Sequence, residues 1–418
     1  MEYTPIEFGA FLAPWHKVDT DAHLAINQDI ELAVEMDRLG FSEFWIGEHH
    51  SGGVEIVADP TLFLAAVSQR TSRIKLGLGV VSLPYHNPFI LADRLVLLDH
   101  LTRGRMIFGA GPGQLVDDSR SIGIDPVENR RKMEQSFDVI TRLLAGETVT
   151  EKTDWYDIQQ AYIQIAPYSA KIQTAVTATV SPTGPKLAGK YGAGILSLAA
   201  TDPAGAEMLQ KHWGIAEEIA AENGQTVDRA NWRLTCPMHI AETEEQAREN
   251  ARHGLLYLMN YLSHVSPGMQ EVDDVDVLID GINSTGFGVI GTPEMAVEQV
   301  KRMQEKSGGF GKLLVLHGEW ANYENSVRKL RAHRRARHAR VQRVEGSPAA
   351  RIRRDGQQRR RWCHRYGCRS GRGAGALRAR ARSSRCQVEP RGLAPPMCGA
   401  ARGFFTPAAP STQQGTHT

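Results

Sequence analysis

The sequence predicts an α/β protein: a (β/α)8 barrel of the TIM-barrel type with insertions, followed by a basic C-terminal segment. Eight short apolar runs, each followed by a helical pattern, fit into about 320 residues. No early strand runs into the G-x-G-x-x-G turn of an open dinucleotide-binding sheet, because Gly77 and Gly79 lie inside a predicted strand. Polar and glycine-rich residues directly follow the predicted strands, which is where such barrels build their sites.

The first half of the chain alternates strands and helices four times. Predicted strands span residues 6–13, 43–47, 74–83 and 105–110. Predicted helices span residues 21–39, 61–71, 89–101 and 128–144. Gly40 stops the first helix, Asp59-Pro60 starts the second, and Pro84 ends the third strand. This order predicts parallel strands joined by right-handed crossovers.

The alternation resumes in the second half after a small excursion at residues 147–166, where polar and aromatic positions alternate. Predicted strands span residues 172–180, 194–198, 232–240 and 312–317. Predicted helices span residues 185–191, 203–223, 243–262, 293–305 and 321 to about 330. Residues 266–291 are acidic and glycine-rich, so we expect a loop there.

Charge is distributed very unevenly along the chain. The net charge is +2, from 49 basic and 47 acidic residues. Residues 328–418 hold 22 arginines and one lysine against three acids, which leaves 26 basic and 44 acidic residues in 1–327. We therefore divide the chain into an acidic barrel domain, 1–327, and an arginine-rich low-complexity segment, 328–418.

Three interpretations of residues 328–418 are open: a disordered basic arm, a nucleic-acid-binding arm, and a product of a shifted reading frame. Arginine with alanine, glycine, proline and serine, and almost no lysine or acid, is typical of a GC-rich gene read out of frame. The change falls inside a helix that begins normally at residue 321. We favour a frameshift from about Val327, which leaves this segment without an evolved function and alters the closing helix.

Cysteines and the N-terminus indicate a cytoplasmic protein. Cys236 is the only cysteine before residue 328, as expected of a chain without a disulfide framework. The first residues lack the basic and apolar regions of a signal peptide, and no apolar run is long enough for a membrane helix. We expect neither a membrane nor a nucleic-acid partner.

The residues that follow the predicted strands are the candidate site residues, because strand ends meet at one mouth of a barrel. In chain order they include Trp15, Glu48, His49, His50, His86, Gly111, Ser181, Thr183, Gly184, Ser197, His317 and Glu319. Adjacent histidines at a strand end point in opposite directions, so we expect no metal site. An imidazole oriented by the neighbouring carboxylate is better suited to proton transfer.

Residues 181–184 (Ser-Pro-Thr-Gly) could hold an anion. Two hydroxyls, a small residue and the free N–H groups of a helix start suit a phosphate, and Arg130 could add a charge-assisted contact. An ordinary helix cap is the competing interpretation.

An ordered set of motifs resembles the bacterial luciferase-like flavin monooxygenases. The set comprises Glu48-His49-His50, Leu83-Pro84-x-x-Asn87-Pro88, Gly104-Arg105-x-x-Phe108-Gly109 and Ser181-x-Thr183. Within that family, the run G-A-G-P-G-Q-L at 109–115 looks most like the limonene monooxygenase-like branch. The resemblance covers residues 6–325.

The resemblance implies an enzyme that uses O2 and reduced FMN or FAD, the flavin coming from a separate NAD(P)H-dependent reductase. It places His49 near the flavin C4a, with Glu48 as the neighbouring buried carboxylate. It places Gly79-Val80, where the family has a bulge that is often a cis peptide, under the flavin ring, and Ser181, Thr183 and Arg130 at its phosphate. We add Gly111, Gly184 and Ser197 as cofactor contacts, and Trp15, Leu83, His86 and Phe108 as lining of the substrate pocket. Luciferases proper carry a cysteine where this chain has Gly111, so light emission is not expected.

The expected reaction is insertion of one oxygen atom into a small apolar molecule such as a terpene or ketone. Two alternatives stay open: hydride transfer with a deazaflavin, and a non-catalytic flavin-binding subunit. A homodimer is compatible with the sequence. The residues distinguish neither the substrate nor FMN from FAD.

Overall fold

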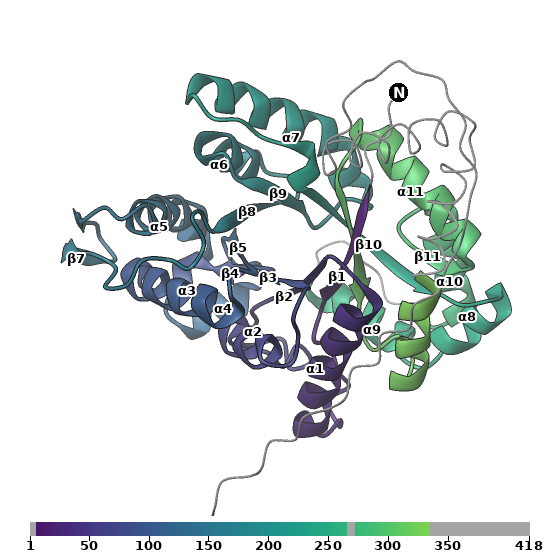
Figure 1. Ribbon diagram of the computed structural model, residues 1–418. Helices are drawn as coiled ribbons and strands as arrows, with labels where there is room; N and C mark the ends of the chain where they lie inside the picture. Colours follow the sequence, from purple (N-terminus) through teal and green to yellow (C-terminus); the bar gives the residue numbers. More distant parts are fainter. Residues whose placement is uncertain (1–5, 266–271, 334–418) are drawn as a thin grey trace, which may run out of the picture. The chain divides into compact units, whose positions relative to one another are not determined.

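The computed structural model describes residues 6–265 and 272–333, and within them the predicted barrel is present (Figure 1). Eight parallel strands form one sheet in the order β12-β1-β2-β3-β5-β8-β9-β10. Pairing of β10 with both β9 and β12 closes the sheet into a barrel. The strands are β1 (Glu7–Leu12), β2 (Glu43–Ile46), β3 (Lys75–Leu78), β5 (Met106–Gly111), β8 (Gln173–Ala178), β9 (Gly194–Ser197), β10 (Trp232–Ile240) and β12 (Lys312–His317).

A layer of helices surrounds the strands (Figure 1). These helices are α1 (Ala22–Leu39), α2 (Pro60–Ser68), α3 (Pro88–Thr102), α5 (Asn129–Leu144), α6 (Thr183–Tyr191), α7 (Pro203–Glu222) and α11 (Pro293–Ser307). Asp21, Asp59, Asn87 and Asp202 cap α1, α2, α3 and α7 through their side chains. Gly40 ends α1 in the left-handed conformation, as predicted.

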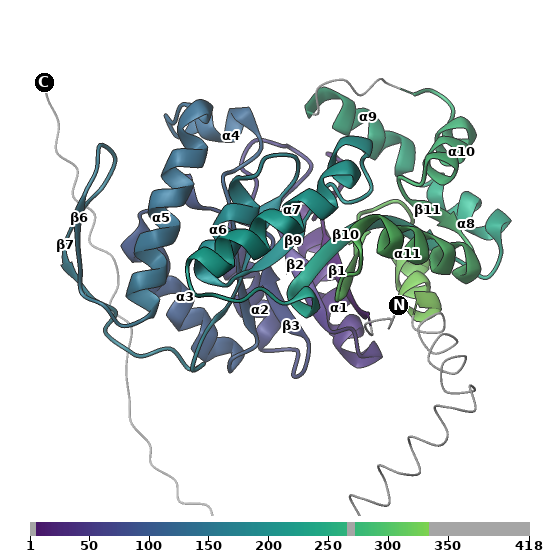
Figure 2. The same cartoon turned by 90° about the horizontal axis from the view of Figure 1, so that it is seen from above.

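The excursion at 147–166 is an antiparallel hairpin of β6 (Val149–Lys152) and β7 (Asp157–Ala161), which lies outside α5 (Figure 2). Short 3-10 turns precede α3 (η1, Leu83–Tyr85), α5 (η2, Pro126–Glu128) and β10 (η3, Arg229–Asn231).

The prediction of a loop at 266–291 was wrong for the residues that the structure describes there. They form α10 (Val275–Thr285) and β11 (Val289–Gly291), which pairs with β10. Asp274, counted as part of an acidic loop, caps α10 through its side chain. Leu278, Ile279 and Ile282 are the buried residues of this helix, and their short apolar pattern is diluted by aspartates and a glycine.

Two other predicted elements are interrupted. The strand at 74–83 divides into β3 and β4 (Val81–Ser82) at a cis peptide bond between Gly79 and Val80. The helix at 243–262 divides into α8 (Glu244–Ala251) and α9 (Leu255–Val265). A Cβ on Gly254, between them, would lie 2.0 Å from the Glu319 carbonyl oxygen, so this break lets the chain pack against the end of β12.

The helix predicted to begin at 321 spans residues 323–333 and continues without a break past Val327. It crosses our proposed boundary between residues 327 and 328. Apart from residues 328–333, the predicted basic segment lies outside the described residues.

The barrel interior is filled around one tryptophan. Trp45 is fully buried and packs with Ile107, Ala175, Leu196 and Leu314, one residue from each of four other strands. Glycines on the neighbouring strands leave room for its ring. A Cβ on Gly77 would lie 2.2 Å from that ring, and one on Gly109 would lie 2.9 Å from it.

A buried ion pair lies at the N-terminal ends of the strands. Arg233 donates to Glu43 with an Nε–Oε2 distance of 2.7 Å and an Nη2–Oε1 distance of 2.9 Å, and both side chains are fully buried. Trp45 Nε1 donates to the same carboxylate at 2.8 Å, and Lys312 Nζ lies 3.6 Å from it. This end of the barrel is therefore closed by charge pairing, and the opposite end is the one available for a site.

In the part of the chain that the structure covers, no helix has the length and apolar character to cross a membrane.

Candidate active site

His49 is the best-connected candidate at the mouth of the barrel, at the C-terminal ends of the strands. Its Nδ1 lies 3.3 Å from Asp118 Oδ2, and its Nε2 lies 3.0 Å from Glu55 Oε2. Both ring nitrogens therefore face carboxyl groups, and neither of these is the neighbouring Glu48. The predicted pairing of His49 with Glu48 was wrong.

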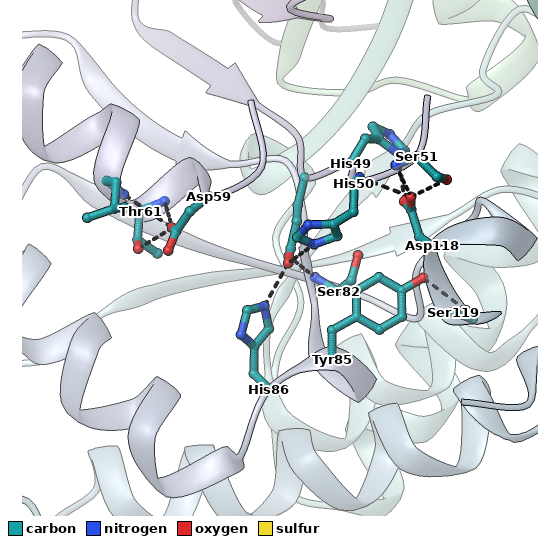
Figure 3. A network of polar contacts seen from close by, with 12 residues as sticks. His49, His50, Ser51, Asp59, Thr61, Ser82, Tyr85, His86, Asp118 and Ser119 are labelled. Carbon is teal, nitrogen blue, oxygen red and sulfur yellow. Dashed lines mark hydrogen bonds and ion pairs between the residues drawn. The ribbon is translucent and has the colours of Figure 1, made fainter. Parts of the chain in front are cut away.

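Local structure explains where the two partners of His49 come from. Glu55 pairs with Trp15 in an isolated antiparallel bridge between the segments that follow β2 and β1. Asp118 lies in α4 (Val116–Ser121), a short helix after β5 that the sequence did not predict. Asp118 also accepts hydrogen bonds from the backbone N–H groups of His50 at 3.0 Å and Ser51 at 2.6 Å (Figure 3). Donors from the β2 loop thus hold it beside His49.

Charge in this cluster is asymmetric. Burial would raise the pKa of Asp118, but hydrogen bonds from His49, Ser51 and the His50 backbone lower it to about 2. Burial raises the pKa of Glu55, despite the opposing effect of His49. Burial opposes protonation of His49, but the hydrogen bond to Asp118 and the charge of Glu55 raise its pKa on balance. Asp118 is thus the fixed anion, and His49 and Glu55 hold the exchangeable protons.

Glu48 organises a second cluster. Its side chain is fully buried, and its Oε1 accepts from His86 Nε2 at 2.8 Å and from His50 Nε2 at 3.0 Å. Its Oε2 accepts from the Ser82 backbone N–H at 2.8 Å. Burial alone would raise the pKa of Glu48, but its histidine and backbone donors lower it. Glu48 is therefore a carboxylate that orients two imidazoles.

His86 reaches this cluster from the segment between η1 and α3. Its backbone N–H donates to Leu83 and closes the turn, and the next residue, Asn87, caps α3. Tyr85, in the same turn, contacts the His50 ring edge-on with centroids 6.0 Å apart and hydrogen-bonds Ser119 at 3.0 Å. The segment after the third strand therefore contributes His86, which binds Glu48 in the segment after the second strand.

Gly79, Val80 and Gly111 lie together, as expected. Val81 and Ser82 pair with Ala110 and Gly111, which brings β4 against the end of β5. A Cβ on Gly111 would lie 2.4 Å from Val80 Cγ2, so the absence of a side chain at 111 makes room for Val80. Val80 is partly exposed above the barrel interior, together with Phe11 and Leu198. This arrangement forms an apolar floor at the mouth.

The predicted phosphate residues lie at the start of α6. Pro182 at the N-cap makes no side-chain hydrogen bond, but Ser181 Oγ accepts from the Thr183 backbone N–H at 3.3 Å and lies 3.2 Å from Thr183 Oγ1. Arg130 is exposed and has no hydrogen bond or ion pair within the described parts of the chain. Gly184 has a different reason for its small size, because a Cβ there would lie 1.8 Å from the Thr177 carbonyl oxygen of β8. Packing against β8 therefore explains, without a cofactor contact, why residue 184 is a glycine.

Three predicted site residues do not line the mouth. Phe108 is fully buried and stacks on Phe137 of α5 at 5.9 Å, so it points into the helix layer. Trp15 is fully buried beneath Tyr257 of α9. Ser197 is 2% exposed and accepts a hydrogen bond from Trp232 at 3.0 Å. These contacts argue against pocket roles for Phe108 and Trp15 and against a cofactor contact for Ser197.

Leu83, also predicted to line the substrate pocket, is fully buried. Across the two described segments, no group of three or more histidine, cysteine, aspartate or glutamate side chains could hold a metal ion. Asp118 and Glu55 were missed because they follow no strand directly. Glu55 has one sequence signal, an acidic residue a few positions after a candidate histidine, and Asp118 has none.

Residues 6–309 match a family described as luciferase-like monooxygenase. Limonene 1,2-monooxygenase of Rhodococcus erythropolis is 73% identical over 321 residues, which is 77% of this chain and 83% of that protein. The 4-hydroxyprotoasukamycin monooxygenase of Streptomyces nodosus subsp. asukaensis is 41% identical over 326 residues, covering 76% of this chain and 88% of that one.

A solved structure shares the fold. The oxygenating constituent of 3,6-diketocamphane monooxygenase from Pseudomonas putida, a type II Baeyer–Villiger monooxygenase in complex with FMN, superposes with a TM-score of 0.65. It is 23% identical, and the likeness covers 78% of this chain and 96% of that one.

Proposed function

The chain belongs to the luciferase-like monooxygenase family, and we propose that it inserts one oxygen atom of O2 into a small apolar terpene, using reduced flavin supplied by a separate NAD(P)H-dependent reductase. The observation that carries this proposal is the 73% identity to a limonene 1,2-monooxygenase over 321 residues. Limonene is therefore the first substrate to test, and ketones are the second class.

The residues at the mouth fit a flavin mononucleotide. The start of α6, the hydroxyls of Ser181 and Thr183 and the guanidinium of Arg130, which has no ion-pair partner among the described residues, are suitable donors for a phosphate. Val80 and the residues around it offer an apolar surface for a flat ring. We propose FMN because this donor set serves one phosphate group, and a structural relative binds FMN. When bound, the reduced flavin supplies two electrons for the reaction with O2.

Within this proposal, Arg130, Ser181 and Thr183 bind the phosphate, and Phe11, Val80 and Leu198 exclude water from the reacting atoms.

His49 holds a proton at Nε2 toward Glu55, while Asp118 fixes its ring through Nδ1. This pair of contacts leaves His49 able to exchange a proton without turning its ring. His49 is thus the proposed catalytic residue, and Asp118, not Glu48, is the carboxylate that orients its ring.

Oxygen uptake coupled to product formation tests this function. The chain, an NADH-dependent flavin reductase, FMN and limonene should consume O2 and yield a product that contains one oxygen atom from 18O-labelled O2. His49→Gln should lower the rate of product formation by about 10²-fold or more, since general acid–base catalysis contributes about 10²–10⁴-fold. His23→Gln, an exposed histidine of α1, is the matched control and should not change the rate.

Two outcomes would contradict the proposal. Hydride transfer with a deazaflavin and no O2 uptake would indicate the first alternative. Tight FMN binding without turnover on terpenes or ketones would indicate a flavin-binding subunit. Repeating the assay with FAD tests the choice of FMN.

A further inference from the structure

The Glu48 cluster is separate from His49 and is not used by the reaction scheme above. It contains two imidazoles that share one buried carboxylate oxygen, with distances of 2.8 Å from His86 Nε2 and 3.0 Å from His50 Nε2 to Glu48 Oε1. A carboxylate only accepts hydrogen bonds, so both rings must present an N–H at Nε2. This fixes the tautomer of both rings in their neutral forms and leaves each Nδ1 with a lone pair.

Neither Nδ1 atom is used elsewhere. In the described residues, no hydrogen bond or ion pair reaches Nδ1 of His50 or His86. The His50 side chain is 31% exposed and the His86 side chain is 21% exposed, whereas Glu48 is fully buried. The His50 and His86 rings therefore each present a basic Nδ1 atom at the barrel mouth, while their Nε2 atoms bind the same buried carboxylate.

One carboxylate can compensate only one imidazolium ion. A proton added to one Nδ1 makes that ring cationic. A second proton on the other ring would create two cationic rings that bind the same carboxylate oxygen and repel each other. Interacting groups of this kind take up protons in separate steps. The hydrogen bond to Glu48 raises the pKa of His50 despite partial burial, the charges of Glu48 and Asp118 add to this effect, and the charge of His49 opposes it.

We propose that His50, Glu48 and His86 form a one-proton store, in which either ring can carry the extra proton on Nδ1, and that this proton is given to the oxygen atom released as water. This inference rests on the proposed monooxygenase function. Insertion of one oxygen atom and release of the other as water consumes two electrons, which reduced flavin supplies, and two protons. In the proposed step an N–H bond of the imidazolium breaks, an O–H bond forms, and the ring returns to its neutral form. Solvent reloads the store through the more exposed His50.

The protonation behaviour can be tested without flavin. We expect imidazole 15N NMR of the full-length chain to show His50 and His86 as Nε2–H tautomers when neutral, with protonation in two separated steps. In His50→Gln, His86 should take up its proton at a higher pH than in the wild type, because the competing charge is gone. In Glu48→Met, which removes both oxygen acceptors, both rings should lose their fixed tautomer. An Nδ1–H tautomer for His86, or an unchanged His86 titration in His50→Gln, would overturn the store.

The catalytic role needs a second measurement. Either His50→Gln or His86→Gln leaves one ring on Glu48, so each should lower product formed per O2 less than the double variant does. The double variant should lower the rate of product formation by about 10²-fold and remove one ionisation from the pH profile. His100→Gln, an exposed histidine at the end of α3, is the control.

The two proposals fail in different ways. If the wild type forms no oxygenated product, the proposed function is wrong, but the NMR titration still decides whether the store exists. If the titration is as expected and the double variant keeps the wild-type rate and pH profile, the store does not take part in the reaction and the inference is wrong.

Discussion

At the scale of single residues, the alternation of side chains along a strand predicted the contacts of the two histidines better than closeness in sequence did. Alternate residues of an extended chain point to opposite sides, and His49 and His50 do enter different clusters. Proximity in sequence suggested that Glu48 orients His49, whereas it orients His50 and His86. A carboxylate two residues from one imidazole and 38 from another can bind both, because the third strand end lies beside the second.

The partners of His49 could not be predicted in this way. Asp118 is 69 residues away in a six-residue helix, and Glu55 is placed by a bridge to the segment after β1. Both positions depend on loop conformations, which carry no periodic apolar pattern.

The ion pair at the closed end of the barrel gives a prediction on stability. Glu43→Gln should lower the free energy of unfolding by about 3–5 kcal/mol, because Arg233 would keep its buried charge without a compensating carboxylate. Chemical denaturation at neutral pH measures this change. Glu35→Gln is the control, since Glu35 pairs with exposed arginines and such pairs contribute only about 0–1 kcal/mol. Equal losses in the two variants would contradict the assignment.

The pH dependence of this pair has a definite sign. Burial would raise the pKa of Glu43, but Arg233 and Lys312 hold it below its usual value. A lowered folded-state pKa stabilises the protein above the pKa of the unfolded chain, and the contribution disappears as the pH falls through the folded-state pKa. The wild type should therefore lose more stability on acidification than the Gln variant does.

At the scale of elements, apolar periodicity was sufficient for all eight barrel strands and for the helices that cover them. It failed where an element is short or interrupted. Helix α10 was missed because three aspartates and a glycine stand within or just before its apolar stripe. Apolar periodicity predicted one continuous third strand, and only the family resemblance indicated the irregularity at Gly79-Val80, where the strand divides.

The closing helix, residues 323–333, contains a buried amine without a counter-ion. Lys329 is 1% exposed, its Nζ lies 3.2 Å from His317 Nδ1, and no carboxylate in the described parts of the chain pairs with it. Burial lowers its pKa from 10.5 to about 7. His333, one turn further on, is also buried, and burial lowers its pKa to about 3. Two ionisable side chains of this helix are therefore buried without a carboxylate partner among the described residues.

Lys329→Met should stabilise the protein by at least about 1 kcal/mol, because an apolar side chain of similar length removes the cost of burying the amine. The gain should be largest below pH 7. Between about pH 7 and 10.5 the unfolded chain binds more protons at this lysine than the folded chain does, so wild-type stability rises with pH and the difference shrinks. Thermal unfolding at several pH values measures it. Lys301→Met, an exposed lysine of α11, should show no such trend.

At the scale of the whole molecule, the closure of the barrel was predicted by counting strands. No local pattern indicates that β9 pairs with β10, or that β12 returns to β1 across 305 residues from Glu7 to Lys312. Closure follows from the general behaviour of eight consecutive strand–helix units. The sequence could not predict how the β6–β7 hairpin or α9 and α10 are added to it.

We propose that the barrel domain and the basic segment are independent, and that the segment arises from a shifted reading frame. The buried ionisable side chains of the closing helix, Lys329 and His333, support this proposal, since residues translated out of frame are not selected to match their surroundings. All eight strands and the pairings that close them lie between residues 7 and 317.

A chain shortened to residues 1–333 should therefore keep the melting temperature and oxygenase activity of the full chain. Differential scanning calorimetry and the oxygen-uptake assay check this together. A melting temperature several degrees lower would show that residues 334–418 contribute to the fold. Resequencing the gene tests the frameshift directly, because an unchanged frame would contradict it.

The packing of Trp45 also constrains how this protein can change over time. The indole occupies space that Gly77 of β3 and Gly109 of β5 leave vacant, and Gly79, which follows β3, also lies beside Trp45. The atoms nearest to a Cβ at Gly77 all belong to the indole, so enlarging Gly77 is tolerated only after the tryptophan has become smaller, and a smaller residue at 45 leaves a void until Gly77 is enlarged. Gly109 and Gly79 are held small by other neighbours as well, since a Cβ there would lie 1.8 Å from the Leu78 carbonyl oxygen and 2.8 Å from the Phe11 ring, respectively. Evolution across this set therefore has to pass through a less stable intermediate. We expect homologues to contain either the large residue with its glycines or a different filling altogether, with few mixtures.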